Sequence, residues 1–327
     1  MLDLTSKPIA VLVQGLGPIG KEILKAAHQD PHLNVVGVVD IDSSLAGTRL
    51  GDHDLEPSDI VISSSLETAN AAEVVLHATG SYLESVAPQI EKALALGLNV
   101  VSTCEELSFP FFRHPALSET LNRSAQGRGL AVVGTGVNPG FMMDRLPLTM
   151  ASVSHSIRSI HVRRVQNPTS RRLPFQTKVG LGLSVQEFEA LASRGSLGHV
   201  GLEESARLIA TGLNWELEKW TQNIEPVLAE SGKLVSGLIE ILEAGTTDGK
   251  VLSLRFEAHS GVSDSFDAIN IDGRPPIDLH IAGGVAGDDA TAASVLQAAK
   301  VIKLARKGLI SVLELPLGSH KLSSADR

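Results

Sequence analysis

The chain has 327 residues, a net charge of −9 and a single cysteine. This length predicts more than one domain, because a single hydrophobic core rarely grows beyond roughly 250–300 residues. The negative charge argues against a broad nucleic-acid surface, and one cysteine excludes an intrachain disulfide and argues against a cysteine-based zinc site. The start of the sequence lacks the pattern of a signal peptide, and no apolar run approaches the roughly 20 residues that span a bilayer. We therefore expect a cytoplasmic protein that binds neither nucleic acid nor a membrane.

The first half of the chain alternates short apolar runs with helical patterns. The runs are Ile9–Val13, Val35–Val39, Val74–Ala78, Leu98–Val101 and Leu130–Val133. Between two of them, residues 84–96 have apolar side chains at helical spacing, and Gly97 follows where a helix-ending glycine belongs. Apolar runs separated by helices are typical of strands buried on both faces of a parallel sheet. The pattern predicts a doubly wound α/β domain with strand order 3-2-1-4-5-6.

The pattern changes after about residue 150. Apolar and polar residues alternate over 252–258 and again over 277–281, after the hairpin-type dipeptide Asp272-Gly273. Such alternation predicts a largely antiparallel, open sheet with one buried face. Residues 185–212 have the composition and spacing of a helix. The second half therefore predicts an α+β domain.

A glycine motif, Gly15-Leu16-Gly17-Pro18-Ile19-Gly20, directly follows the first apolar run and opens a helix. Gly15 permits a tight turn, Gly17 lets the backbone approach a pyrophosphate, and Gly20 allows close packing of helix on strand. The helix N-terminus supplies N–H donors for the phosphates. The stretch also resembles a P-loop, but Glu22 stands where that motif needs Ser or Thr to hold Mg²⁺. We therefore predict a Rossmann domain that binds NAD or NADP.

Other predicted cofactor contacts lie at the ends of later strands. Asp40 ends the second run, where a carboxylate accepts the ribose hydroxyls of NAD and repels the 2′-phosphate of NADP. Arg49, in the next loop, is able to meet such a phosphate, so the sequence favours NAD without excluding NADP. Thr79 and Gly80 follow a further strand at the carboxyl edge of the sheet, where ligands of open α/β sheets bind.

The sequence Cys104-Glu105-Glu106 follows the next strand at the same edge. Neighbouring side chains of an extended segment point to opposite sides, so we expect one glutamate to enter the site and the other to cap the following turn. A carboxyl group beside a nicotinamide is partly desolvated, which raises a carboxyl pKa and suits general acid–base chemistry. Two exposed loop glutamates fit the spacing equally well. Cys104 is predicted to pack close to the cofactor.

The segment Gly134–Asp144 ends the last strand of the first domain. We expect Asn138 to hydrogen-bond substrate or nicotinamide amide, and Phe141 and Met142 to wall an apolar pocket. A rigid interdomain hinge is a second, compatible interpretation. His199 is a further candidate for the substrate pocket, although a lone histidine is more often structural. We predict no metal site.

Two arginine pairs, Arg163-Arg164 and Arg171-Arg172, have the chemistry to bind a substrate carboxylate bidentately. Such pairs more often lie on a solvated surface. Arg164 is the candidate for the substrate pocket, and a role there predicts an amino acid rather than a simple amine as the substrate.

We divide the chain into a dinucleotide-binding domain at 1–138, a substrate and dimerisation domain at 139–286, and a C-terminal helix and tail at 287–327. Apolar residues at helical spacing from Ala292 to near Gly308 predict that last helix. We expect it to pack back on the first domain, and the active site to lie in the cleft between the first two domains.

Six pieces of the sequence carry a resemblance to a known family: GLGPIGKEI, VVDID, HATGS, NVVSTCEELSFP, VGTGVNPGFMMD and TSRRLPFQTKVG. Together they resemble the NAD(P)-dependent amine dehydrogenases that act on amines lacking a carboxylate, which are related to 2,4-diaminopentanoate dehydrogenase. A more distant resemblance is to dihydrodipicolinate reductase, whose paired-histidine motif is absent here. The CEEL and GTGVNPGF pieces are the specific ones.

The resemblance implies a catalytic glutamate, which we assign to Glu105 with Glu106 as its alternative. It also implies homodimers joined through the second domain and an apolar pocket for a small ketone or aldehyde. The expected activity is reversible oxidative deamination of small primary amines, in reverse the reductive amination of ketones or aldehydes with ammonia. Two alternatives remain. One is a dehydrogenase of an amino or diamino acid such as 2,4-diaminopentanoate. The other is a non-catalytic NAD(H) redox sensor, against which the paired glutamates and the large second domain argue.

Overall fold

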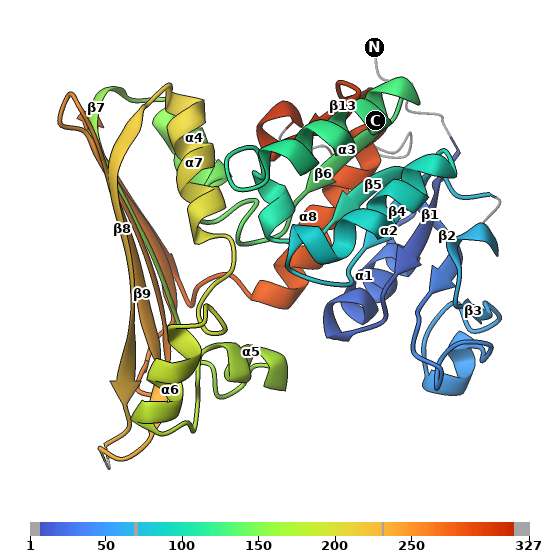
Figure 1. Ribbon diagram of the computed structural model, residues 1–327, viewed down its shortest axis with the longest axis horizontal. Helices are drawn as coiled ribbons and strands as arrows, with labels where there is room; N and C mark the ends of the chain where they lie inside the picture. Colours follow the sequence, from blue (N-terminus) through green and yellow to red (C-terminus); the bar gives the residue numbers. More distant parts are fainter. Residues whose placement is uncertain (1–6, 69–70, 231, 317–327) are drawn as a thin grey trace. The chain divides into compact units, whose positions relative to one another are not determined.

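A computed structural model describes residues 7–68, 71–230 and 232–316 of the chain. The chain forms two compact units (Figure 1). Unit 1 contains the residues up to 140 together with those from 287 onward, and unit 2 contains residues 141–286. Within the described ranges, no helix is both long enough and apolar enough to cross a membrane.

Unit 1 is built on a seven-stranded parallel sheet with the order β13-β6-β5-β4-β1-β2-β3. The strands are β1 (Ile9–Gln14), β2 (Leu33–Val39), β3 (Ile62–Ser63), β4 (Val74–His77), β5 (Asn99–Ser102), β6 (Ala131–Gly134) and β13 (Gly308–Ile310). The predicted order 3-2-1-4-5-6 is therefore confirmed. The sheet gains one edge strand, β13, which the sequence analysis did not predict because its three-residue run is too short to stand out.

Four longer helices cover the two faces of this sheet. They are α1 (Pro18–Gln29), α2 (Leu83–Ala95), α3 (Pro115–Gly127) and α8 (Gly287–Val301). The crossovers β1–α1–β2 and β4–α2–β5 run in opposite directions, so right-handed connections place α1 and α2 on opposite faces. α2 and α3 share one apolar core with the sheet, while α8 packs against α1. On that side Lys300 Nζ donates to Asp30 Oδ2 at 2.7 Å, an ion pair with both side chains largely buried.

The start and end of α2 agree with the predicted helix to within one residue. Leu96 is its C-cap, and Gly97 follows in the left-handed conformation (φ 81°) that glycine adopts without strain. All four residues of β4 are buried, as are those of β5 and β6. Burial on both faces explains why these strands are apolar runs rather than alternating patterns.

Unit 2 is a six-stranded mixed sheet with the order β12-β11-β7-β10-β9-β8. Its strands are β7 (His155–Gln166), β8 (Leu217–Leu228), β9 (Val235–Thr246), β10 (Val251–His259), β11 (Phe266–Arg274) and β12 (Ile277–Ala282). Only the β7–β10 pair is parallel, which confirms the predicted open, largely antiparallel sheet. Helices α4 (Arg145–Ala151), α5 (Leu173–Lys178), α6 (Val185–Ala192) and α7 (Leu202–Leu213) lie on one face of the sheet (Figure 1).

The alternation of apolar and polar residues along β10 determines which face of the unit 2 sheet packs on the helices. Leu252, Leu254 and Phe256 are buried, whereas the intervening Ser253 and Arg255 are only half-buried on the other face. Because side chains of a strand alternate between the faces, one face packs on the helices and the other does not. No helix of the described part of unit 2 covers that second face.

The hairpin β11–β12 is confirmed, but its turn lies later than predicted. Ile271 pairs with Ile277, and β11 continues through Asp272 and Gly273 to Arg274. Gly273 sits instead at an irregularity of the β11–β7 pairing, where a Cβ would lie 2.3 Å from Ser154 Oγ. The glycine is required by this close approach, not by a tight turn.

The helical prediction for residues 185–212 is correct only in part. α6 ends at Ala192 and α7 begins at Leu202. Between them Gly195, Gly198 and Gly201 all have positive φ. These left-handed positions end the first helix and precede the second, so the stretch forms two helices joined by a fixed loop.

Candidate active site

The glycine motif forms the turn between β1 and α1. Gly15 has φ 93°, and a Cβ there would lie 2.5 Å from the carbonyl oxygen of Ala78. A Cβ on Gly20 would lie 1.8 Å from the carbonyl oxygen of Gly15, so helix and turn are in direct contact. A Cβ on Gly17 would meet nothing within 4 Å. The first and third glycines are therefore required by packing, whereas the second faces open space at the start of α1. This arrangement fits a dinucleotide pyrophosphate.

Leu16, Pro18 and Ile19 complete the motif. Pro18 is the first residue of α1, where its missing N–H costs nothing, and Leu16 is buried. The backbone N–H of Leu16 donates to Asp40 Oδ2 at 2.6 Å, and the N–H of Asp42 donates to Asp40 Oδ1 at 2.8 Å. The Asp40 carboxylate is thus held beside the glycine turn. An ionised carboxylate offers about four lone-pair sites, so each oxygen keeps capacity for a ribose hydroxyl.

Thr79 and Gly80 are exposed and directly follow Ala78 at the end of β4. The methyl carbon of Thr79 would lie 3.0 Å from a Cβ on Gly15. The structure therefore brings Thr79 and Gly80 to the glycine turn, as the sequence predicts for residues at this edge.

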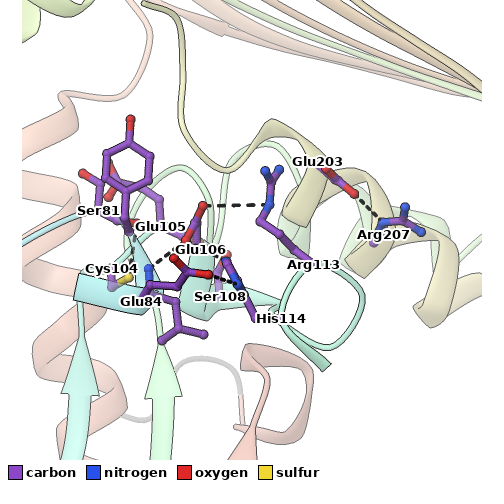
Figure 2. Close-up of polar contacts among 12 residues, drawn as sticks. Ser81, Glu84, Cys104, Glu105, Glu106, Ser108, Arg113, His114, Glu203 and Arg207 are labelled. Atoms are coloured by element: carbon purple, nitrogen blue, oxygen red, sulfur yellow. Dashed lines mark hydrogen bonds and ion pairs between the residues drawn. The ribbon is translucent and has the colours of Figure 1, made fainter. Parts of the chain in front are cut away.

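Glu106 is buried, with 6% of its surface exposed. Its Oε2 accepts the backbone N–H of Leu83 at 2.7 Å and lies 2.9 Å from His114 Nε2. Its Oε1 lies 4.0 Å from Arg113 Nε (Figure 2). Leu83 is the first residue of α2, so Glu106 satisfies an N–H donor at that helix start. One of the two glutamates therefore caps a helix, as predicted. The helix is α2, which precedes Glu106 in the chain, and not the turn that follows it.

Glu105 is half-buried and occupies the N-cap of the 3₁₀ helix η3 (Glu106–Ser108). Its carbonyl oxygen accepts the N–H of Ser108 at 3.2 Å and the hydroxyl of Ser108 at 2.6 Å. The backbone here is helical rather than extended, yet successive side chains of a 3₁₀ turn still point in different directions. The two glutamates accordingly have different environments.

Cys104 packs beneath this turn. Its Sγ lies 3.2 Å from the carbonyl oxygen of Ser81, and burial raises the pKa of the thiol to about 12 (Figure 2). The thiol is therefore neutral at physiological pH and is not a nucleophile. Among the residues that the structure describes, no cluster of three or more His, Cys, Asp or Glu side chains is arranged to hold a metal ion.

The segment after β6 folds tightly against the glutamate turn. A Cβ on Gly134 would lie 2.4 Å from the carbonyl carbon of Leu107, and Gly140 has φ 124° with its Cβ position 2.5 Å from the N atom of Gly136. The N–H of Val137 donates to Thr291 Oγ1 of α8 at 3.2 Å. Asn138 is half-buried within this segment. The structure thus places Asn138 in a rigid turn at the same sheet edge.

The remaining candidates belong to unit 2. Met142 is buried and Phe141 is half-buried at the start of this unit. Arg164 is 2% exposed, and its Nη1 donates to both oxygens of Asp267 at 2.8 and 3.0 Å. Its Nη2 donates to the carbonyl oxygen of Val285 at 2.7 Å. The Arg164 guanidinium is thus paired with a buried aspartate of unit 2, and its role in the substrate pocket stays a prediction.

His199 lies in the loop between α6 and α7. Its backbone N–H donates to Glu240 Oε2 at 2.6 Å, and its ring meets Phe256 edge-on with centroids 5.1 Å apart. Burial raises the pKa of Glu240, whose other oxygen accepts from Gln222 at 2.7 Å. The Arg171 guanidinium lies over the Phe175 ring at 4.7 Å. Unit 2 therefore holds an aromatic cluster with His199 fixed at its side.

Comparison with known proteins identifies a family for the chain. The model of the 2,4-diaminopentanoate dehydrogenase C-terminal domain matches residues 141–326, more than half of the chain. The chain belongs to the family of proteins with this domain. It is 28% identical to 2,4-diaminopentanoate dehydrogenase of Acetoanaerobium sticklandii, over 94% of each chain.

Solved structures share the fold. The amine dehydrogenase from Mycobacterium smegmatis superposes with a TM-score of 0.84 at 20% identity, covering 95% of this chain and 97% of that one. GenD2 from gentamicin A biosynthesis, solved in complex with NAD, superposes with a TM-score of 0.55 at 16% identity, covering 85% of this chain and 73% of that one.

Three polar residues near the candidate site were not predicted from the sequence: Gln14, His77 and Ser102. Each is buried and is the last residue of its strand, directly after an apolar stretch. His77 Nδ1 lies 2.8 Å from Ser102 Oγ, and its Nε2 lies 3.1 Å from Gln89 Oε1. A polar residue ending each of three neighbouring apolar runs is the signal that reveals them.

His77 makes stability depend on pH. Complete burial lowers its pKa from 6.5 to about 4. In the unfolded chain the imidazole binds a proton below about pH 6.5, whereas in the folded chain it stays neutral until about pH 4. The free energy of unfolding should therefore fall as pH falls through this window. Because a tenfold change in proton affinity is worth about 1.4 kcal/mol, the loss is on the order of 3 kcal/mol.

Urea unfolding at pH 7.5 and pH 4.5 measures this effect, with His77→Asn as the control that cannot bind the proton. We expect the pH-dependent loss of stability to be smaller in the variant. An equal loss in both proteins would show that other groups cause it.

Proposed function

We propose that this chain is an NAD(P)-dependent amine dehydrogenase. It catalyses the reversible oxidative deamination of small primary amines, and in reverse the reductive amination of ketones or aldehydes with ammonia. The observation that carries the proposal is the division of roles at Glu105-Glu106: Glu106 is buried in structural contacts, whereas Glu105 is half-buried at the edge where the dinucleotide turn lies. The family membership and the amine-directed relatives support the same reaction class.

The dinucleotide would be held by residues of unit 1. The turn at Gly15–Gly20 fits the pyrophosphate, and the first N–H groups of α1 would bind its oxygens. Asp40 would accept the adenosine ribose hydroxyls, which favours NAD over NADP. Thr79, Gly80 and Asn138 would lie toward the nicotinamide end.

The bound nicotinamide supplies the acceptor or donor of hydride. In deamination the substrate ammonium must first lose a proton, because a protonated nitrogen has no electron pair to support departure of a hydride. The carboxylate of Glu105 accepts that proton as general base. In amination, ammonia adds to the carbonyl carbon and gives a carbinolamine, which must lose water. The same carboxyl group then donates a proton to the departing hydroxyl. Its negative charge also stabilises the iminium cation of the substrate.

A dehydrogenase of an amino or diamino acid is the second candidate, favoured by the match to 2,4-diaminopentanoate dehydrogenase. It requires a cation for the substrate carboxylate. Arg164 is already paired with Asp267, so this requirement would fall to another basic residue of unit 2 such as Arg171.

Two copies of the chain are proposed to join through the face of the unit 2 sheet that the described helices leave uncovered. Ionic and aromatic side chains lie there: Arg255 Nη2 is 2.9 Å from Glu257 Oε2, and the Arg163 guanidinium lies 5.3 Å from the Phe266 centroid. One face paired with itself gives a two-fold symmetric dimer. Analytical ultracentrifugation should give twice the 34.5 kDa of one chain.

A substrate panel separates the candidate functions. The purified protein is incubated with NAD⁺ or NADP⁺ and with primary amines, amino acids, diamino acids or alcohols at alkaline pH, where the amine is more often unprotonated. We expect reduced cofactor to form with primary amines that lack a carboxylate. Reaction with amino or diamino acids alone would replace the first candidate by the second, and no reaction with any substrate would favour the redox sensor.

Glu105→Gln should lower turnover by roughly 10²–10⁴-fold, the usual range for loss of a general acid–base group. Dinucleotide affinity should be unchanged, because the amide keeps the shape of the side chain. Glu106→Gln is the matched control: it should lower thermal stability, since it weakens the contacts with Leu83 and His114, and affect turnover less. Turnover and melting temperature are measured for both variants. If their effects on turnover are reversed, the roles must be exchanged.

Asp40→Ala should weaken NAD binding by about tenfold or more relative to NADP binding, because a hydrogen bond to a charged group is worth about 1.5–3 kcal/mol. The change also removes the acceptor for Leu16 N–H. NADP binding therefore serves as the internal control, since a disturbed turn weakens both cofactors equally. Fluorescence titration with NADH and NADPH measures the ratio, and an unchanged ratio would contradict the ribose assignment.

A further inference from the structure

A hydrogen-bond network around one buried histidine joins the ends of three parallel strands beneath the candidate site. Its centre is His77, the last residue of β4, which is 1% exposed. Its Nδ1 lies 2.8 Å from Ser102 Oγ, at the end of β5. Its Nε2 lies 3.1 Å from Gln89 Oε1 and 2.9 Å from Thr79 Oγ1. Gln14, at the end of β1, joins the network through Gln89, with Nε2 to Oε1 at 3.1 Å.

The donors and acceptors select one state of the imidazole. Gln89 Oε1 is an acceptor only, and it also accepts the Thr79 hydroxyl at 2.8 Å. Nε2 of His77 therefore carries a proton and donates toward this oxygen. Burial keeps the ring neutral, so Nδ1 accepts from the Ser102 hydroxyl, whose oxygen accepts the N–H of Cys104 at 3.0 Å.

The network has two arms, one from each ring nitrogen of His77, and each arm ends at a residue next to a turn of the candidate site. The Nδ1 arm runs through Ser102 to the N–H of Cys104, the residue before Glu105. The Nε2 arm runs through Gln89 to Gln14, the residue before Gly15 of the dinucleotide turn. The first three residues of β4 are apolar and buried. In β4 the buried polar residue is thus the last one, His77, at the end of the strand that lies next to the candidate site.

We propose that His77 is a positioning residue for the reaction. Through its two ring nitrogens it fixes the position of the glutamate turn relative to the dinucleotide turn. The inference rests on the proposed function, because it assigns catalysis to Glu105. Backbone bonds transmit the same register: the N–H of Thr103 donates to the carbonyl oxygen of His77 at 2.9 Å, and that of Ala78 to the carbonyl oxygen of Gln14 at 2.8 Å. A shift of the His77 strand end would move both neighbouring turns.

Two conservative variants separate the arms. In His77→Asn the short amide reaches only the Nδ1 position, so it keeps the bond with Ser102 and loses the bond with Gln89. In His77→Gln the longer amide reaches the Nε2 position and keeps the bond with Gln89 while losing that with Ser102. We expect His77→Asn to weaken NADH binding by about tenfold with turnover within about twofold. We expect His77→Gln to lower turnover by about tenfold with NADH binding nearly unchanged.

The measurements are the NADH dissociation constant by fluorescence, kcat with the best amine of the panel, and the melting temperature. The proposal would be overturned if the two variants changed the NADH dissociation constant and kcat equally. It would also be overturned if they changed only the melting temperature. Ser102→Ala should resemble His77→Gln, and combining the two should lower turnover no further. Additive losses would also overturn it. Wild-type protein that binds NADH but oxidises no amine would instead refute the proposed function, and the NADH arm of the experiment would still test the Nε2 link.

Discussion

The parallel hydrogen-bond ladder of unit 1 does not stop where its strands stop, and the candidate site depends on this continuation. The first residue beyond each of β1, β4, β5 and β6 is held by a neighbouring strand: Gly15 N–H donates to the carbonyl oxygen of Val39, and Thr135 N–H to that of Ser102. Ala78 and Thr103 are held in the same way by β1 and β4. The turns that carry the glycine motif, Thr79, Glu105 and Asn138 therefore start from one common edge. Side chains at that edge have to satisfy the remaining polar groups, which explains why the last residues of β1, β4 and β5 are polar.

Two adjacent glutamates at this edge have unequal surroundings, and the difference follows from what each one touches. Glu106 accepts the N–H of Leu83 at a helix N-terminus and lies 2.9 Å from His114 Nε2, so the turn is anchored to α2 through a buried side chain. An anchored Glu106 fixes the backbone of Glu105 without using the Glu105 side chain. A proton-transfer group needs a defined position. The pair thus places the half-buried Glu105 directly before a rigidly held, buried Glu106.

Sequence patterns were sufficient wherever the determinant was local. The glycine motif and the alternation along β10 follow from spacing within a few residues, and the structure has both. The strand order follows from the general rule for the doubly wound fold that the motif and the alternating runs indicate. Several features that the sequence does not reveal have long-range causes. The pairing of Arg164 is one, because its partner Asp267 lies 103 residues away on the neighbouring strand β11. Asp272-Gly273 has the composition of a tight turn, but contact with Ser154 requires that glycine inside a strand. His77 and Ser102 are 25 residues apart, so only the parallel pairing of β4 with β5 brings them together.

The pairing of Arg164 with Asp267 also bears on the substrate. A guanidinium beside a substrate site selects carboxylates, because a carboxylate accepts two of its N–H groups at once. In this chain both oxygens of Asp267 take that place, and the N–H of Val285 donates to the same carboxylate at 2.8 Å. The buried ion pair thereby ties the start of β11 to β7 and to the chain leading to α8. Both terminal nitrogens of the Arg164 guanidinium are therefore occupied by groups of unit 2 itself, Nη1 by the Asp267 carboxylate and Nη2 by the carbonyl oxygen of Val285.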